Sequence, residues 1–222
     1  MAFIHKTSEY KQYELESITT DQGRRYKVPG SVIEYESMTT ALGKRPEKIK
    51  ALKEWRQRVG EQEAQKISTQ ASRTGTKVHQ IAEDYLNNNK DYIKDKMPIE
   101  IDMFNKLKPA LDESINEIYG IESSLYSNKF RLAGRTDCIA KWNGKLAIID
   151  FKTSSKPKKE EWIEDYRLQC AGYSFMFEEL YSKKIELNVI LITVKATGEL
   201  QTFYSEPYKY YTHQFFKERI IA

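Results

Sequence analysis

The chain has 222 residues, enough for one domain with a buried core, and its 40% hydrophobic and 31% charged residues are typical of a folded globular protein. The formal charge of +4 neither requires nor excludes a nucleic-acid partner. Two cysteines, Cys138 and Cys170, are too few for a disulfide framework or a paired zinc site, and no apolar run approaches the roughly 18 residues of a membrane span.

The N-terminal half is expected to be mainly helical. Its first 16 residues lack a long apolar region and soon become acidic, which argues against a signal or transit peptide and predicts a cytoplasmic protein. Hydrophobic periodicity and turn residues then predict two short strands within residues 12–28 and helices over 39–43, 46–59, 61–72, 74–86 and 98–119. The break before the fourth helix is placed at Thr74-Gly75.

In the C-terminal half the spacing of hydrophobic residues changes from helical to strand-like, so this half is expected to supply most of the sheet. Strands are predicted over 119–126, 132–142, 145–151, 186–195 and 200–205, and helices over 160–181 and 208–220. The sequence thus predicts a single α/β domain over residues 1–222, with a mixed sheet flanked by helices. Within it, residues 39–118 form a helical cover and residues 119–222 form a catalytic core.

The chemistry is expected on one β-hairpin. Asn143-Gly144 favours a two-residue type I′ turn, which fixes the register of the two strands. Continued outward, this register pairs Asp137 with Asp150 and Arg135 with Lys152. Because side chains alternate along a strand, Asp137, Asp150 and Lys152 share one face.

Two carboxylates directly opposite each other repel, and the hairpin would place them beside an apolar strand. A divalent cation between Asp137 and Asp150 makes the same arrangement favourable, because Mg²⁺ accepts oxygen ligands from both. The carbonyl oxygen of Phe151 is a candidate third ligand. Lys152 then lies where it can position a water molecule and offset phosphate charge. The pattern therefore predicts a Mg²⁺ or Mn²⁺ site.

At these residues the sequence resembles the PD-(D/E)xK nucleases, and more narrowly their RecB-type branch. Four motifs occur in the order of that family: Arg73-Thr74-Gly75-Thr76-Lys77-Val78-His79, Gly134-Arg135-Thr136-Asp137, Asp150-Phe151-Lys152-Thr153-Ser154 and Gln169-Cys170-Ala171-Gly172-Tyr173. The first departs from the family pattern by the insertion of Thr74. Residues 37–43 and 55–60 are also similar to stand-alone phage exonucleases and to mitochondrial genome maintenance exonucleases.

The resemblance implies a restriction-endonuclease-like core and roles for individual residues. It implies that His79 is a metal ligand or lines the metal pocket, and that Gln169 and Tyr173 hold Lys152 or a DNA phosphate. Glu122 is either an auxiliary metal ligand or a surface residue. The catalytic set is then His79, Asp137, Asp150 and Lys152. Further DNA contacts are expected from Arg73, Thr153, Lys156, Lys158 and Lys159, although the three lysines alone also suit a solvated loop.

The resemblance and the residues together predict a metal-dependent DNA exonuclease that acts on single-stranded ends, in replication, recombination or repair, with a phage gene as one possible source. Candidate partners are DNA and replication or recombination proteins. Two cysteines exclude the four-cysteine iron–sulfur cluster of some relatives, and no ATP-binding motif is present. A non-catalytic DNA-binding module and a structure-specific endonuclease remain open. Three aromatic residues are candidates for stacking on unpaired bases: Tyr126, Trp162 and Tyr166.

Overall fold

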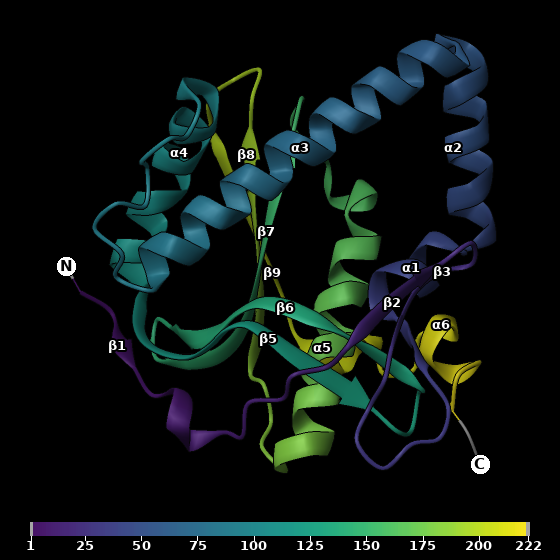
Figure 1. The fold of residues 1–222 in the computed structure, drawn as a ribbon, viewed down its shortest axis with the longest axis vertical. Helices are drawn as coiled ribbons and strands as arrows, with labels where there is room; N and C mark the ends of the chain where they lie inside the picture. Colours follow the sequence, from purple (N-terminus) through teal and green to yellow (C-terminus); the bar gives the residue numbers. More distant parts are fainter. Residues whose placement is uncertain (1, 221–222) are drawn as a thin grey trace.

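The computed structural model describes residues 2–220 (Figure 1). Its strands are β1 (Ile4–His5), β2 (Ser17–Thr20), β3 (Gly23–Tyr26), β4 (Tyr35–Ser37), β5 (Ile115–Ser127), β6 (Leu132–Trp142), β7 (Lys145–Ser154), β8 (Leu187–Val194) and β9 (Leu200–Ser205). Its α-helices are α1 (Met38–Gly43), α2 (Pro46–Val59), α3 (Glu61–Leu86), α4 (Pro98–Ser114), α5 (Glu164–Tyr181) and α6 (Gln214–Lys217). Short 3₁₀ helices are η1 (Thr7–Glu9), η2 (Glu160–Trp162) and η3 (Pro207–Tyr210). Among these residues, no helix is long and apolar enough to cross a membrane.

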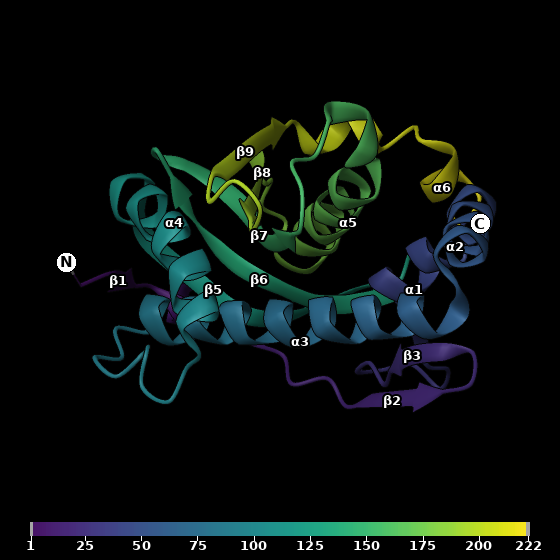
Figure 2. The ribbon, with the colours of Figure 1, turned by 90° about the horizontal axis from the view of Figure 1, so that it is seen from above.

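The strands of the described residues form one mixed sheet. Its order is β2-β3-β4-β6-β7-β8-β9, with β5 paired to β6 and β1 paired to β5. Helices α3 and α4 cover one face and α5 covers the other (Figure 2). Each face buries its own apolar cluster, one beneath α3 and α4 and one beneath α5. The sheet is therefore packed on both sides, as the apolar stretches of β7 and β8 require.

Strand β6 leaves an opening in this sheet. Along one edge it pairs with β5, whereas its other edge pairs with β4 at residues 132–133 and with β7 at residues 138–142. Residues 134–137 therefore have no strand partner on that second edge within the described chain. Helices from both faces of the sheet can reach this opening, which contains the sequence Gly134-Arg135-Thr136-Asp137.

The cover predicted over residues 39–118 differs from expectation at one point. Helix α2 has its predicted bounds, but the predicted break at Thr74-Gly75 is wrong, because α3 runs without interruption from Glu61 to Leu86. Gly75 serves close packing instead. A side chain added there would lie 3.3 Å from the hydroxyl of Thr153 on β7. The small residue therefore lets α3 approach the sheet, which sequence periodicity does not reveal.

Helix α2 packs little against the rest of the protein. It has no buried residue, and Figure 1 shows α2 and the N-terminal part of α3 extending beyond the sheet before they meet at Gly60. Its base is attached to α5 through Arg45, whose guanidinium lies 2.6 Å from both Glu164 and Asp165. The two helices therefore project as an arm fixed at its ends.

Several other elements differ from the sequence-based expectation. Helix α4 ends at Ser114, five residues before the predicted end, because Ile115 and Ile118 enter β5 and pair with β6. The helix predicted over residues 208–220 is replaced by the short helices η3 and α6. Strands β1 and β4 were not predicted. Each has only two or three residues, too few for a clear sequence pattern; β1 pairs with the distant β5, and β4 pairs with the neighbouring β3 and the distant β6.

Candidate active site

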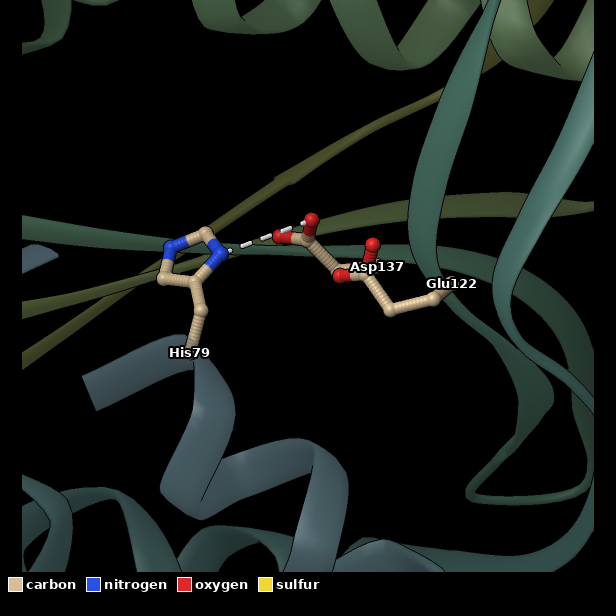
Figure 3. A group of neighbouring side chains, drawn as sticks. All are labelled: His79, Glu122 and Asp137. Carbon is tan, nitrogen blue, oxygen red and sulfur yellow. Dashed lines mark ion pairs between the residues drawn. The ribbon is translucent and has the colours of Figure 1, made fainter. Parts of the chain in front are cut away.

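Three side chains from three different elements meet at the opening beside β6. His79 comes from α3, Glu122 from β5 and Asp137 from β6, and one potential ligand atom of each lies within 4.8 Å of the others. Figure 3 shows the imidazole and the two carboxylates pointing toward one another. The structure thus brings the predicted ligands His79 and Asp137 together and adds Glu122, which the sequence left open between a ligand and a surface residue.

The backbone sets the position of each member. On α3, Val78, Ile81 and Ala82 are buried, so His79 lies at the edge of the stripe that faces the sheet, with its ring edge-on to Phe151. Glu122 lies opposite Asp137, because the strand pairs on either side of them are in register.

Glu122 also has a left-handed backbone conformation, with φ of 48°. A non-glycine residue seldom adopts this conformation within a strand, and such strain often accompanies functional sites. The strain supports the interpretation of Glu122 as a member of the site.

The predicted hairpin register is confirmed up to the opening. Strands β6 and β7 pair from Trp142–Lys145 to Cys138–Ile149, as the Asn-Gly turn requires. The regular ladder then stops, so the expected pairing of Asp137 with Asp150 and of Arg135 with Lys152 is not continued. The backbone N–H of Phe151 instead donates to Asp137 Oδ2 at 2.7 Å. The carboxylate oxygen takes the place of the backbone carbonyl that would accept this hydrogen bond in a regular ladder. This bond keeps Asp137 in place at the opening beside β6.

Asp150 and Lys152 form a second group in the site. Asp150 is 1% exposed, and the Lys152 ammonium lies 2.6 Å from its Oδ1 and 2.5 Å from its Oδ2. The amide of Gln169 donates to Asp150 Oδ1 at 3.2 Å, and the Lys152 ammonium lies 5.3 Å from the ring centre of Tyr166. Helix α5 therefore fixes Asp150 and Lys152 from the opposite face of the sheet. Gln169 contacts Asp150 here, whereas the resemblance implied Lys152 or a phosphate.

Crowded acidic groups make the site electrostatically unfavourable without a cation. Burial, together with the charges of Asp137 and Glu83, raises the pKa of Glu122 to about 7. Burial likewise raises the pKa of Asp150, and the charge of Asp137 adds to this effect although the Lys152 ammonium opposes it. A positive charge placed among these carboxylates would stabilise both of them as anions.

The basic members of the site respond to the same acids. Burial is the largest single influence on His79 and lowers its pKa, but the charge and hydrogen bond of Asp137, whose Oδ1 lies 3.6 Å from His79 Nδ1, and the charge of Asp150 together raise the pKa overall. Burial also lowers the pKa of Lys152, yet Asp150 and Asp137 raise it overall, so the side chain is an ammonium ion. Lys152 is therefore a cationic hydrogen-bond donor in this arrangement.

The donor set fits a divalent cation. Two carboxylates and one imidazole converge, and the buried carboxylate of Asp150, paired with the Lys152 ammonium, belongs to the same site. Oxygen and imidazole ligands together suit Mg²⁺ and, with the nitrogen, Mn²⁺. The role of the Phe151 carbonyl oxygen as a ligand stays a prediction.

A cleft of about 690 Å³ opens over these residues. Its lining includes His79, Glu122, Asp137, Lys152, Gln169 and Tyr173. Sequence reasoning did not assign several further residues of the lining, among them Arg24, Ser37, Thr39, Gln80 and Arg135. Arg135 lies inside a recognised motif and could have been found there. Arg24 carries no such signal, because only the tertiary fold brings the β2–β3 hairpin to the cleft.

Two glycines of the motifs have steric roles. A side chain at Gly134 would lie 2.8 Å from the ring of Tyr173, and one at Gly172 would lie 2.7 Å from the thioether of Met38. Contacts this short are repulsive. At Gly134 the neighbour is a buried ring that has no room to move, so this position requires glycine, whereas at Gly172 the flexible end of Met38 can shift. Tyr173 is thereby packed against β6 and is almost completely buried. Its predicted contact with DNA would involve only the edge of the ring that lines the cleft.

The remaining predicted DNA contacts lie outside the cleft. Arg73 is exposed on α3 beside Glu100, and Thr153 faces α3 on the side of β7 opposite Lys152. Lys156 and Lys159 are exposed in the loop after β7, whereas Lys158 is partly buried and its backbone bonds to Gln201. The structure does not place these residues beside His79, Glu122 and Asp137, and their contact with DNA stays a prediction.

Known proteins resemble this chain. Mouse mitochondrial genome maintenance exonuclease 1 is 25% identical over 157 residues, which are 68% of this chain and 46% of the mouse protein. Its human counterpart is 31% identical over 103 residues, 41% of this chain and 29% of that protein. The counterpart from Xenopus tropicalis is 25% identical over 164 residues, 70% of this chain and 46% of that protein. The chain spans less than half the length of these relatives.

The sequence pattern of the PD-(D/E)XK nuclease superfamily matches residues 36–219. This range contains all four motifs and every member of the candidate active site. The expected fold, a restriction-endonuclease-like core with a mixed sheet flanked by helices, is confirmed. Since the match covers most of the chain, the protein belongs to the PD-(D/E)XK nuclease superfamily.

Proposed function

We propose that this protein is a metal-dependent DNA exonuclease that hydrolyses phosphodiester bonds from single-stranded ends, in DNA replication, recombination or repair. The observation that carries the proposal is the convergence of His79, Glu122 and Asp137 beside the buried Asp150–Lys152 pair. This combination offers ligands for a divalent cation and a fixed ammonium at one place. A protein that only bound DNA would gain nothing from holding these acids together.

Each residue has a role in this proposal. His79, Glu122, Asp137 and Asp150 would hold Mg²⁺ or Mn²⁺, which when bound activates water and stabilises negative charge at phosphorus. The Lys152 ammonium donates to a phosphate oxygen and offsets the charge that develops there. Asp150 and Gln169 keep that ammonium aimed into the cleft. Phe151 N–H keeps one oxygen of Asp137 occupied, so the other is available for a cation.

The preference for single-stranded ends is supported by the arm formed by α2 and α3. Helix α2 carries Lys48, Lys50, Lys53, Arg56 and Arg58 against Glu47 and Glu54, so it is clearly basic. A basic helix without buried residues suits contact with a phosphate backbone, and α3 joins this helix to the cleft, which α3 lines with Thr76, His79 and Gln80. A strand that passed beneath the arm would need a free end. This requirement would make the enzyme an exonuclease.

Linear and circular DNA test the proposal directly. End-labelled linear single strands should be degraded with Mn²⁺ or Mg²⁺ and left intact with EDTA, and covalently closed circular single strands should be spared. Circles cut as fast as linear strands would establish an endonuclease instead. No cleavage of any DNA with either metal, in a protein that still binds DNA, would leave only a binding module.

The salt dependence of binding tests the contribution of the loop after β7. If Lys156, Lys158 and Lys159 contact phosphates, replacing all three with alanine should reduce the salt slope of single-strand binding by up to about 2. Sequence preference should not change, because phosphate contacts carry no base information. A matched control replaces Lys90, Lys94 and Lys145, which lie on other parts of the chain, and should leave the slope unchanged. An unchanged slope in the first variant would make the loop an ordinary solvated one.

A further inference from the structure

One large aromatic side chain near the site is unusually exposed. Trp162, the last residue of η2, is 58% exposed, although neither of the other two tryptophans is exposed to a comparable degree. A tryptophan loses favourable burial free energy when it is left in water. The Lys159 ammonium lies 5.2 Å from its ring centre, so one side of the indole is already accompanied by a cation. An exposed ring with a cation beside it is the arrangement that recognises a nucleobase and its phosphate.

The backbone around Trp162 is held in place. Its N–H donates to the carbonyl oxygen of Lys159 at 3.0 Å, and the next residue, Ile163, is completely buried beneath α5. An ion pair between Glu160 and Arg167 ties η2 to the first turns of α5. Because the segment is anchored on both sides, the indole is presented to solvent without a large loss of entropy on binding.

Trp162 lies close to Lys152 along the chain. Tyr166, in the first turn of α5, follows Trp162 by four residues, and the centre of its partly buried ring lies 5.3 Å from the Lys152 ammonium. Four residues span at most about 14 Å. A strand held at Lys152 would therefore lie within a few nucleotides of Trp162.

The charges around Trp162 favour a polyanion. Lys156, Lys158 and Lys159 form no ion pair within the described residues. Most neighbouring acids are neutralised, since Glu160 pairs with Arg167, and Glu164 and Asp165 pair with Arg45. Glu161 is the exception. The surface beside the indole thus has an excess of free positive charge, which suits DNA better than an apolar protein partner.

From these contacts we infer that Trp162 is a base-stacking subsite, on which one unpaired nucleobase of the substrate stacks while Lys159 contacts the adjoining phosphate. The inference rests on the proposed function and deepens it. Bases in a duplex are stacked on each other and expose only their edges, so this subsite accepts single strands alone. It provides a physical reason for single-strand selectivity that is independent of the arm.

Binding without cleavage tests the subsite. The affinity of Trp162→Ala for oligo(dT) is measured with Ca²⁺ in place of the catalytic metal, by anisotropy. It should fall about 5- to 100-fold, whereas the affinity for a blunt duplex should stay within about twofold. Trp162→Phe should restore most of the loss, because a ring is again available. Tyr204→Ala is the matched control: Tyr204 is 52% exposed on β9, and its loss should change neither affinity.

Abasic substrates and fluorescence distinguish base stacking from a purely structural role of Trp162. A single abasic site should abolish the difference between wild type and Trp162→Ala at one position of the oligonucleotide and leave it at the others. Oligo(dT) should also quench the tryptophan fluorescence of the wild type more than that of Trp162→Ala. Equal losses on single strand and duplex, or no position dependence, would overturn the subsite. A wild type that shows the stacking signature without cutting DNA would instead refute the proposed function.

Discussion

Removing the charge of Glu122 should have opposite effects on the protein with and without metal. The pKa of Glu122 is raised to about 7 in the folded protein, against 4.5 for an ordinary glutamate. The folded state holds this proton more tightly than the unfolded state does. Protonation of Glu122 therefore contributes fully to the free energy of unfolding below pH 4.5, and this contribution is lost as the pH rises through 7. A shift of this size corresponds to about 3 kcal/mol at most, and partial exposure reduces it to about 1–2 kcal/mol.

Glu122→Gln should therefore melt roughly 2–8 °C higher than the wild type at pH 8 in EDTA, and at nearly the same temperature at pH 4. With saturating Mn²⁺ the difference in melting temperature between variant and wild type should shrink or change sign. The reason is that the wild type binds the ion through a carboxylate ligand that the variant lacks, and so gains stability by mass action. Differential scanning calorimetry measures all four conditions. The control is Glu113→Gln, at an exposed position on α4, which should not change the melting temperature. Equal melting of wild type and Glu122→Gln in EDTA at pH 8, or equal stabilisation by Mn²⁺, would refute the electrostatic argument.

Three further predictions concern the opposite side of the site. Asp150→Asn should lower turnover at least about 100-fold while circular dichroism shows an intact fold, because the Lys152 ammonium and the cation both lose a partner. Lys152→Ala should lower kcat by about 10²–10³-fold but keep the Kd for DNA in Ca²⁺ within about threefold; a large loss of affinity with turnover preserved would make Lys152 a simple phosphate contact. Gly134→Ala should destabilise the fold by about 1–3 kcal/mol in urea titrations, and adding Tyr173→Leu should recover part of that loss by removing the 2.8 Å clash.

Much of the catalytic hairpin could be predicted from local sequence. The Asn143-Gly144 turn fixes the register between β6 and β7, and the five observed pairs follow it. Alternation then places Asp150 and Lys152 on one face, where their side chains do meet. These features depend on a two-residue turn and on neighbouring residues, so they need no knowledge of the rest of the fold.

The end of that register could not be predicted in the same way. The ladder stops because β4 pairs with β6 at Leu132–Ala133 and because the carboxylate of Asp137 takes the N–H of Phe151. Both interactions join segments far apart in the chain, or replace a backbone acceptor by a side chain. The position of Glu122 depends on a left-handed backbone that no residue preference suggests. Tertiary pairing, rather than propensity, therefore decides where the ligands meet.

The unbroken course of α3 joins the arm directly to a predicted metal ligand. His79 lies four residues beyond Gly75, about 6 Å along the axis, whereas Glu61 lies fourteen residues before it, about 21 Å away. The part of α3 around and beyond His79 carries the buried residues Val78, Ile81 and Ala82, so the core holds it in place while the other end of the helix projects. Movement of the arm would have to disturb these buried contacts before it reached His79. The imidazole is therefore expected to stay in place when nucleic acid contacts the arm.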